Sequence, residues 1–256
     1  MKIYEYGSRE LRTLMLIHGF QCPYQMWEPY IERFSREFHV LVPVLPGHNP
    51  EDPKEFKSFE ENAEELETFC LEIGKQEIYA VYGISMGGVQ AAILWQRGIL
   101  KIRKLIMESS PLYPFGKAMT ALMSKLNADK THQAQKRQKN ALKGAEKMMG
   151  TKNYPYFLQV LDHMSDATME TYMEQVFSYD LPQGCTTEEM EIFYFYGGSP
   201  AEIVFQKAAK RLQQDYPGAV TRCFPGKGHC EDIIKNPEKR FADLCELLQN
   251  CEDKKL

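Results

Sequence analysis

The sequence predicts an α/β protein with a mainly parallel, doubly wound sheet and one inserted helical segment. Short apolar runs alternate along the chain with longer segments of helical period, a pattern typical of a parallel sheet with helices on both faces. The apolar runs are continuous rather than alternating, as expected for strands buried on both sides. The alternation is interrupted once, between residues 112 and 190, where no strand-like run occurs.

The predicted elements follow one another in a regular order. Residues 2–6 form a candidate edge strand, and the other predicted strands are residues 14–19, 38–44, 78–83, 104–108, 191–197 and 219–224. The predicted helices of this part of the chain are residues 26–38, 59–74, 89–98, 202–216 and 237–250. The helix over residues 59–74 starts with acidic residues and closes on Gly74, which suits the helix dipole and a C-terminal stop.

Residues 112–190 are predicted to form several helices inserted into a core made of residues 1–111 and 191–256. An insertion of this length is usually functional, often as a lid over a site. It carries eight of the thirteen methionines, a residue type that suits surfaces adapting to irregular apolar ligands. It also carries a run of lysines, which we interpret as a solvated face; these are Lys125, Lys130, Lys136, Lys139, Lys143, Lys147 and Lys152, with Arg137 among them.

Composition and charge exclude several classes of protein. With 43% apolar and 26% charged residues, the chain can form a sizeable core. Its formal net charge of −4 argues against a nucleic-acid partner, which normally requires a basic face. No stretch approaches the roughly 20 apolar residues that span a bilayer. The N-terminal residues lack a secretory pattern, and the seven cysteines fit neither a zinc site nor a disulfide framework. We therefore expect a cytoplasmic protein with mostly reduced thiols; whether it forms a homodimer stays open.

The segment GISMG places Ser85 between two glycines, in the pattern G-x-S-x-G. A predicted strand precedes it and a predicted helix follows, which is the context this pattern requires. A tight strand-to-helix turn forces the serine into a strained conformation, so the residues two positions away must be small. The turn would raise the hydroxyl at the edge of the sheet and make Ser85 a candidate nucleophile.

A serine nucleophile needs a base, and His229 is the strongest candidate among six histidines. It lies in the segment FPGKGHCED, directly after the last predicted strand, on a loop that glycines make pliable. Such a loop can reach the edge of the sheet where Ser85 stands. His48, in LPGHNP, also follows a strand, and we expect it to line the mouth of the site.

Two backbone amides are predicted to stabilise an oxyanion on the bound acyl group. Met86 follows the serine at the start of a helix, where N–H groups are free and carry partial positive charge. The segment His18-Gly19-Phe20 follows another strand and directs the Phe20 N–H toward the same edge. His18 is expected to brace this loop.

Together these segments resemble the α/β-hydrolase family. LIHGF resembles its oxyanion loop, LPGHN the loop after the next strand, GISMGG its nucleophile elbow and GKGH its histidine loop. The resemblance covers nearly the whole chain outside residues 112–190, where the family commonly inserts a lid. It implies an eight-stranded sheet, a serine–histidine–acid triad and usually no cofactor. We also expect no metal site.

The chain departs from the family at the triad acid. The family usually places Asp in a G-x-x-D context after the strand before the histidine loop, and here Gly197 plus three is Pro200. Glu202 lies two residues further and is the first candidate, because a longer side chain compensates for a shifted backbone. Glu108, at the end of an earlier strand, is the second, and Asp232 is a third that we expect to cap a turn. The triad is defined by geometry, so sequence position leaves the choice open.

These predictions indicate a serine esterase or thioesterase acting on a small to medium apolar substrate through an acyl-enzyme. Two alternatives stay open: an acyltransferase or lyase on the same fold, and a non-catalytic ligand-binding relative that has lost the acid. Neither requires a nucleic acid or a membrane span.

Overall fold

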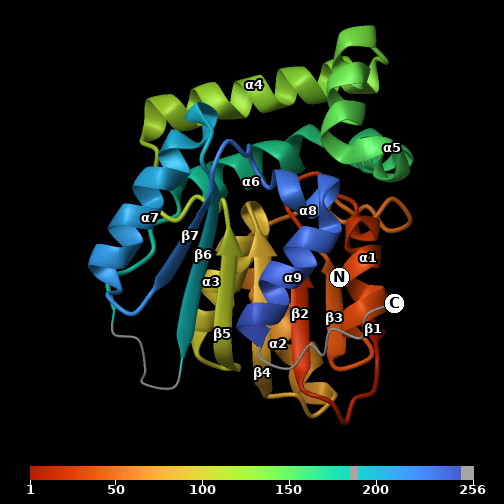
Figure 1. The fold of residues 1–256 in the computed structure, drawn as a ribbon. Helices are drawn as coiled ribbons and strands as arrows, with labels where there is room; N and C mark the ends of the chain where they lie inside the picture. Colours follow the sequence, from red (N-terminus) through yellow and green to blue (C-terminus); the bar gives the residue numbers. More distant parts are fainter. Residues whose placement is uncertain (185–189, 249–256) are drawn as a thin grey trace.

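The computed structural model describes residues 1–184 and 190–248. A sheet lies at its centre and helices cover both faces (Figure 1). In this part of the chain the sheet has seven strands, in the order β1-β3-β2-β4-β5-β6-β7. Strand β1 pairs antiparallel with β3, and all other neighbours are parallel. The strands are β1 Lys2–Tyr6, β2 Thr13–Ile17, β3 His39–Val44, β4 Glu77–Ile84, β5 Lys101–Glu108, β6 Glu191–Gly197 and β7 Val220–Phe224.

The predicted α/β class and mainly parallel sheet are confirmed, but the expected number of eight strands is wrong for the described residues. Each of the seven strand-like segments of the sequence corresponds to one observed strand. The eighth strand was implied by the family resemblance alone. Residues 7–12, between the antiparallel edge strand and β2, form turns and bends, so no further strand precedes the parallel part of the sheet.

Strand β7 also departs from expectation, because it is not buried on both faces. It lies at the edge of the sheet beside β6, and Val220 is 52% exposed.

The central strands behave as predicted: all five residues of β2 are buried. Alternate residues of β2 enter different apolar clusters, Leu14 and Leu16 in one and Met15 and Ile17 in the other, as side chains that point to opposite faces of a sheet must.

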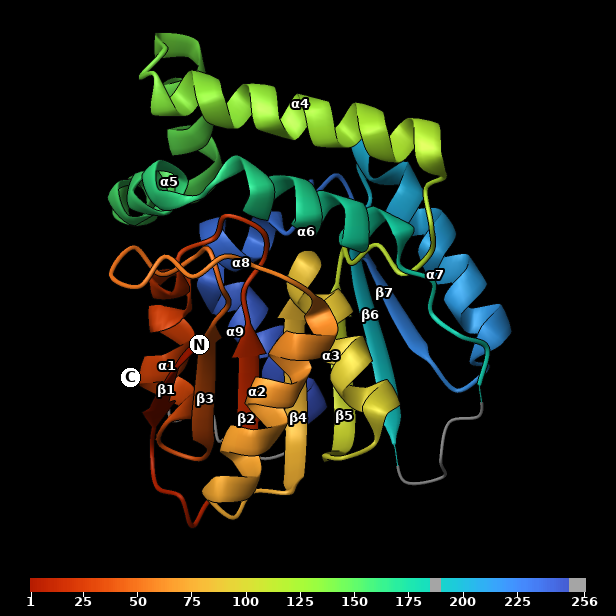
Figure 2. The same cartoon turned by 180° about the vertical axis from the view of Figure 1, so that it is seen from behind.

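Helices α1 (Glu28–Phe34) and α9 (Pro237–Leu248) cover one face of the sheet, and α2 (Phe59–Glu72) and α3 (Met86–Arg97) cover the other (Figure 2). The predicted helix over residues 26–38 begins as a 3-10 turn, η1 (Tyr24–Trp27), before α1. The predicted last helix extends to residue 250, and its final two residues lie outside the described residues. The remaining elements of the core are η2 Pro200–Glu202, α7 Ile203–Asp215 and α8 Glu231–Lys235.

The predicted helical insertion is confirmed between β5 and β6. It consists of α4 (Lys117–Gln135), α5 (Lys139–His163) and α6 (Asp166–Ser178), and α5 bends at Gly150. The three helices lie across the carboxyl ends of the strands (Figure 1). Helix α6 is fastened to the core, because the Tyr172 ring stacks on Phe56 at 3.5 Å and its hydroxyl donates to the Pro46 carbonyl at 2.9 Å.

Five of the seven cysteines are described, and Cys22, Cys70, Cys223 and Cys230 are free thiols. Cys185 and Cys251 lie outside the described residues.

Candidate active site

Ser85 lies at the turn between β4 and α3, in a conformation rare for a residue with a side chain. Its φ is 50° and its ψ is −118°. The turn is possible because Gly83 and Gly87 lack a Cβ: one added to Gly83 would lie 2.2 Å from the Gly87 carbonyl oxygen, and one added to Gly87 2.4 Å from that of Ile17. The Ser85 N–H donates to the Glu108 carbonyl at 2.7 Å. The strain is therefore held by neighbouring strands, as at a nucleophile elbow.

His229 lies beside Ser85, although the two residues are 144 positions apart. Its Nε2 is 3.0 Å from Ser85 Oγ, a distance typical of a hydrogen bond. On the other side of the ring, Nδ1 is 3.4 Å from Glu202 Oε1. This second distance allows an ion pair but exceeds that of a well-formed hydrogen bond. Catalytic contacts in unliganded sites are often long and tighten when substrate binds.

Glu202 is almost fully buried, and its carboxylate has a second partner. It ends the short helix η2 that follows β6. The Ser109 hydroxyl donates to Glu202 Oε2 at 2.9 Å, which leaves Oε1 for the imidazole. Ser109 has a φ of 45°, a further strained residue at the end of β5. The sequence contained one signal for it, since polar residues following a strand of a parallel sheet lie at the same edge as the site.

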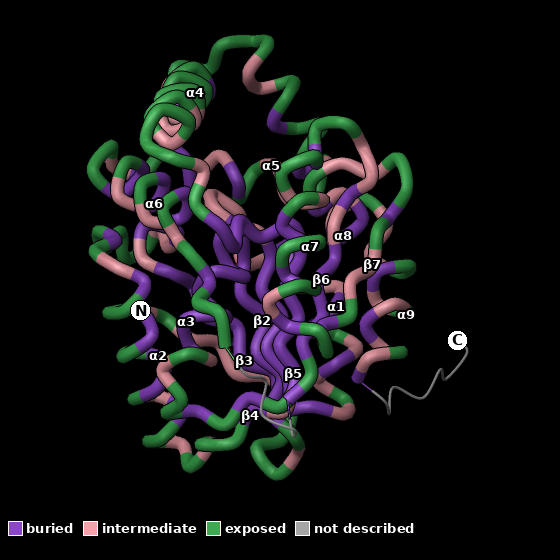
Figure 3. Tube along the Cα trace, turned by 90° about the vertical axis from the view of Figure 1, so that its left-hand side faces the viewer, coloured by how far each residue is buried: buried purple, intermediate pink, exposed green. Residues whose placement is uncertain are grey.

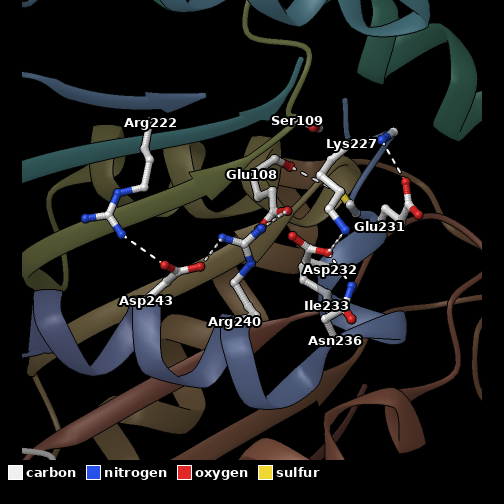
Figure 4. Close-up of polar contacts among 12 residues, drawn as sticks. Glu108, Ser109, Arg222, Lys227, Glu231, Asp232, Ile233, Asn236, Arg240 and Asp243 are labelled. Carbon is white, nitrogen blue, oxygen red and sulfur yellow. Dashed lines mark hydrogen bonds and ion pairs between the residues drawn. The ribbon is translucent and has the colours of Figure 1, made fainter. Parts of the chain in front are cut away.

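Glu108, the alternative acid, faces Arg240 of α9 (Figure 4). Its carboxylate accepts hydrogen bonds from Arg240 Nη2 at 3.1 Å and from the Tyr82 hydroxyl at 2.5 Å. Burial raises the pKa of Glu108, and the Arg240 charge opposes that rise. Arg240 itself is 1% exposed and stacks on the Phe224 ring at 3.9 Å. The carboxylate of Glu108 thus neutralises a buried arginine.

Asp232, the third candidate acid, also binds residues other than His229. It accepts from Asn236 Nδ2 at 2.5 Å and pairs with Lys227 Nζ at 2.8 Å (Figure 4), so it holds together the loop that carries His229. The neighbouring Cys230 is buried, and its thiol donates to the Glu108 carbonyl at 3.6 Å. Burial raises the pKa of this thiol well above its usual value. Cys230 is therefore a protonated packing residue.

Two backbone amides were predicted to bind an oxyanion, those of Phe20 and Met86. In the described part of the chain, neither the Phe20 N–H nor the Met86 N–H has a hydrogen-bond partner. Met86 is the first residue of α3, so the positive end of the helix dipole adds to its N–H. Phe20 lies in a turn in which the Cys22 N–H donates to the Gly19 carbonyl at 3.1 Å.

Two buried neutral histidines fix this turn. The Leu45 N–H donates to His18 Nε2 at 3.1 Å. Because Nε2 accepts, the proton of the neutral ring is on Nδ1, which donates to the Gly19 carbonyl at 2.9 Å. His18 therefore braces the loop, as its position in the sequence suggested. His48 does not line the mouth of the site as expected: it is 1% exposed, and its Nε2 accepts the Gln21 N–H at 2.8 Å. The two rings lie 4.5 Å apart.

Because His18 and His48 are buried in their neutral form, we expect the free energy of unfolding to fall in mild acid. Burial lowers the pKa of His18 to about 4 and that of His48 well below its usual value. Between that pKa and the pKa of about 6.5 in the unfolded chain, the unfolded chain binds more protons. The free energy of unfolding should therefore fall as the pH falls from about 6.5 to about 4, by about 3 kcal/mol for His18 alone.

Urea unfolding at pH 7, 6, 5 and 4.5 measures this dependence. The exposed His163 provides a control, since His163→Gln should leave the slope unchanged. His18→Gln should flatten it. A wild-type stability that does not change between pH 6.5 and 5 contradicts the prediction without any variant.

Gln21, which carries no recognisable signal in the sequence, joins the loop after β2 to the insertion. Its φ is 61°. Its side-chain amide donates to Thr131 Oγ1 on α4 at 2.8 Å and contacts the sulfur atoms of Met164 and Met169 at 3.9 and 3.8 Å. Nothing in the sequence near Gln21 indicates a partner 110 residues away.

Comparison with known proteins places this geometry in a family. A model of the α/β hydrolase fold matches residues 12–181. No curated protein matches the chain. Among solved structures, a protein assigned to the α/β hydrolase family from Desulfitobacterium hafniense superposes with a TM-score of 0.79 at 22% identity, covering 96% of this chain and 100% of its own. A structure from a study of carboxylesterases of Nitrososphaera gargenis gives 0.74 at 15% identity, covering 96% and 93%.

A third similar structure is the enol-lactonase of Burkholderia xenovorans, with a TM-score of 0.71 at 15% identity and coverage of 97% and 96%. At these identities the solved structures show a shared fold. The family model covers well over half of the chain, and its match includes the elbow that carries Ser85. The protein therefore belongs to the α/β hydrolase fold family.

Proposed function

We propose that this protein is a serine hydrolase that cleaves a carboxylic ester or thioester of an apolar, small to medium acyl group through an acyl-enzyme. One observation carries the proposal: Ser85 Oγ lies 3.0 Å from His229 Nε2 on a strained turn. A hydroxyl next to an imidazole base is the arrangement that activates serine for attack on a carbonyl.

The proposed reaction has two halves. His229 Nε2 takes the proton of Ser85 as Oγ bonds to the carbonyl carbon, and the Phe20 and Met86 N–H groups hold the oxygen that becomes negative. The imidazolium then gives its proton to the leaving alcohol or thiol, and an acyl-Ser85 remains. His229 next takes a proton from water, which attacks the acyl carbon. The imidazolium returns that proton to Ser85 Oγ as the bond between Oγ and the acyl carbon breaks and the acid leaves.

Glu202 supports this cycle through electrostatics. With Nδ1 facing its carboxylate at 3.4 Å, the imidazole is held in the tautomer that presents a basic Nε2 to Ser85. The buried negative charge also stabilises the imidazolium that forms during attack. Ser109 acts as a positioning residue, because its hydroxyl orients the carboxylate.

Apolar rings beside these groups favour an apolar acyl part. The Phe205 ring centre lies 4.9 Å from that of His229. The Phe20 ring packs edge-on against His48 and Tyr172. In this proposal the insertion over residues 112–190 acts as a lid and completes the acyl site. Open access to His229, whose side chain is 43% exposed, allows water to reach the acyl-enzyme.

Hydrolysis of p-nitrophenyl esters from acetate to octanoate, and of the matching thioesters, tests the proposal. We expect turnover with kcat/KM that rises from acetate to a medium chain length. Rates equal to those in buffer for every ester and thioester would contradict it.

Product analysis in the presence of an alcohol acceptor separates the alternatives: free acid indicates a hydrolase, and a new ester indicates an acyltransferase. Ligand-induced thermal stabilisation without any product would indicate a binding protein.

A further inference from the structure

Helices α4 and α5 carry a concentration of positive charge that the rest of the molecule lacks. Residues 117–163 contain nine basic and three acidic side chains, a net charge of +6. The whole chain has a net charge of −4, so everything outside these two helices and their short connection sums to −10. A segment of this polarity on an acidic protein creates a local field that attracts anions.

Most of these cations are free of carboxylate partners. Arg137 pairs with Asp162 at 2.6 Å, and Lys152 pairs with Glu28 at 2.9 Å. Seven other lysines are exposed, and no carboxylate of the described chain lies within ion-pair distance of them. They are Lys117, Lys125, Lys130, Lys136, Lys139, Lys143 and Lys147. A face that served only for solubility would normally mix both signs.

The same helices expose large apolar side chains. Met119, Leu122 and Leu126 recur at intervals of three and four residues, so they share one side of α4, and they are 46%, 50% and 43% exposed. Met148 on α5 is 52% exposed. Figure 3 shows that most of the α4 surface is exposed at the top of the molecule. Lysines lie three residues after Leu122 and four after Leu126, so charge borders the apolar side chains.

We use the name basic apolar face for the seven unpaired lysines listed above together with Met119, Leu122, Leu126 and Met148. We propose that this face docks the protein onto an anionic lipid surface. Apolar side chains bordered by lysines are the arrangement by which helices lie in a membrane interface, the apolar part entering the headgroup boundary and the lysines binding lipid phosphates. No described helix has both the length and the apolar composition to cross a bilayer, so the association is peripheral.

The chemistry of the face favours lipid over other polyanions. Met119, Leu122, Leu126 and Met148 are not aromatic, and Tyr156 on α5, at 36%, is the one large exposed ring of the two helices as described. Single-stranded nucleic acid is bound by the stacking of successive bases on several aromatic rings. Only one of its nine cations is arginine, the residue that recognises phosphate and carboxylate bidentately at protein interfaces. Because the helices lie across the carboxyl ends of the strands (Figure 1), docking brings the edge that carries Ser85 toward the lipid. The inference does not depend on the proposed hydrolase reaction.

Co-sedimentation of the full chain with vesicles tests the inference. We expect at least tenfold tighter binding to vesicles of three parts phosphatidylcholine and one part phosphatidylglycerol than to pure phosphatidylcholine at 0.1 M NaCl. Binding should be lost at 0.5 M NaCl, because salt screens exposed charges. Equal binding to both vesicles, or none to either, overturns the proposal.

Matched variants separate the two contributions. A charge variant, with Lys125, Lys130, Lys136 and Lys143 changed to Gln, should bind anionic vesicles at least tenfold more weakly. An apolar variant, with Met119, Leu122 and Leu126 changed to Gln, should also bind more weakly. A control with Leu71→Gln and Lys101→Gln, both exposed residues outside the basic apolar face, should bind like wild type.

Circular dichroism and thermal unfolding check that every variant is folded. Charge and apolar variants that are folded and still bind like wild type contradict the proposal. Binding to soluble polyglutamate without binding to vesicles would instead indicate an acidic protein partner and would also overturn it.

Discussion

Replacement of Ser85 by alanine is expected to lower kcat for p-nitrophenyl butyrate by about 10⁶-fold, the scale seen when a serine nucleophile is removed from a triad. The reason is geometric, since no other hydroxyl lies within the 3.0 Å that separates Ser85 Oγ from the His229 base in the described site. Alanine adopts the same backbone without new strain, so the melting temperature should stay within a few degrees of wild type. Steady-state kinetics and thermal unfolding measure the two quantities.

A serine that does not contact His229 provides the control for this prediction. Ser178 is exposed at the end of α6, and Ser178→Ala should keep wild-type kcat. A Ser85→Ala enzyme that retained more than a hundredth of wild-type kcat, free of contaminating esterase, would show that Ser85 does not carry the reaction.

Glu202→Gln is expected to lower kcat by about 10⁴-fold, because an amide cannot stabilise the imidazolium and favours the wrong tautomer. Its fold should survive, since Gln still accepts the hydrogen bond of Ser109. Kinetics at pH 7 to 9 on protein of verified stability measure this change.

The paired variant Glu108→Gln should behave in the opposite way. It leaves the buried Arg240 with Asp243, at 3.3 Å, as its remaining counter-charge. The loss of the Glu108 charge should cost on the order of 3 kcal/mol of stability, whereas the folded fraction should keep most of its kcat. A folded Glu108→Gln enzyme with a 10⁴-fold loss, beside an active Glu202→Gln enzyme, would assign the acid to Glu108 instead.

The fold was predictable because its signals are local. Continuous apolar runs and a glycine-bounded serine are properties of five to ten neighbouring residues, and the seven strands appear where those runs lie. The prediction of eight strands was wrong because it was based on the strand number usual in the family and not on an apolar run in this sequence. The exposure of β7 could not be inferred from its residues, because an edge strand of a parallel sheet differs from a central one only in what covers it.

The choice between the two acids could not be made from sequence, because it depends on a distant partner. Glu108 and Glu202 both follow parallel strands, and both therefore lie near the same edge of the sheet. What separates them is Arg240, which engages Glu108 from α9, 132 residues away. An arginine in an amphipathic helix is usually exposed, and the sequence does not mark this one as buried. The partners of Ser109 and Gln21 cannot be inferred from the sequence for the same reason, since they are 93 and 110 residues distant.

The most direct test of the proposed chemistry is the covalent modification of Ser85. After incubation with a fluorophosphonate, intact mass followed by peptide mapping should show one adduct per chain, located on Ser85. The adduct should be absent from Ser85→Ala and should form much more slowly in Glu202→Gln. An adduct on another residue, or equal labelling of wild type and Ser85→Ala, would contradict the assignment of Ser85 as the nucleophile.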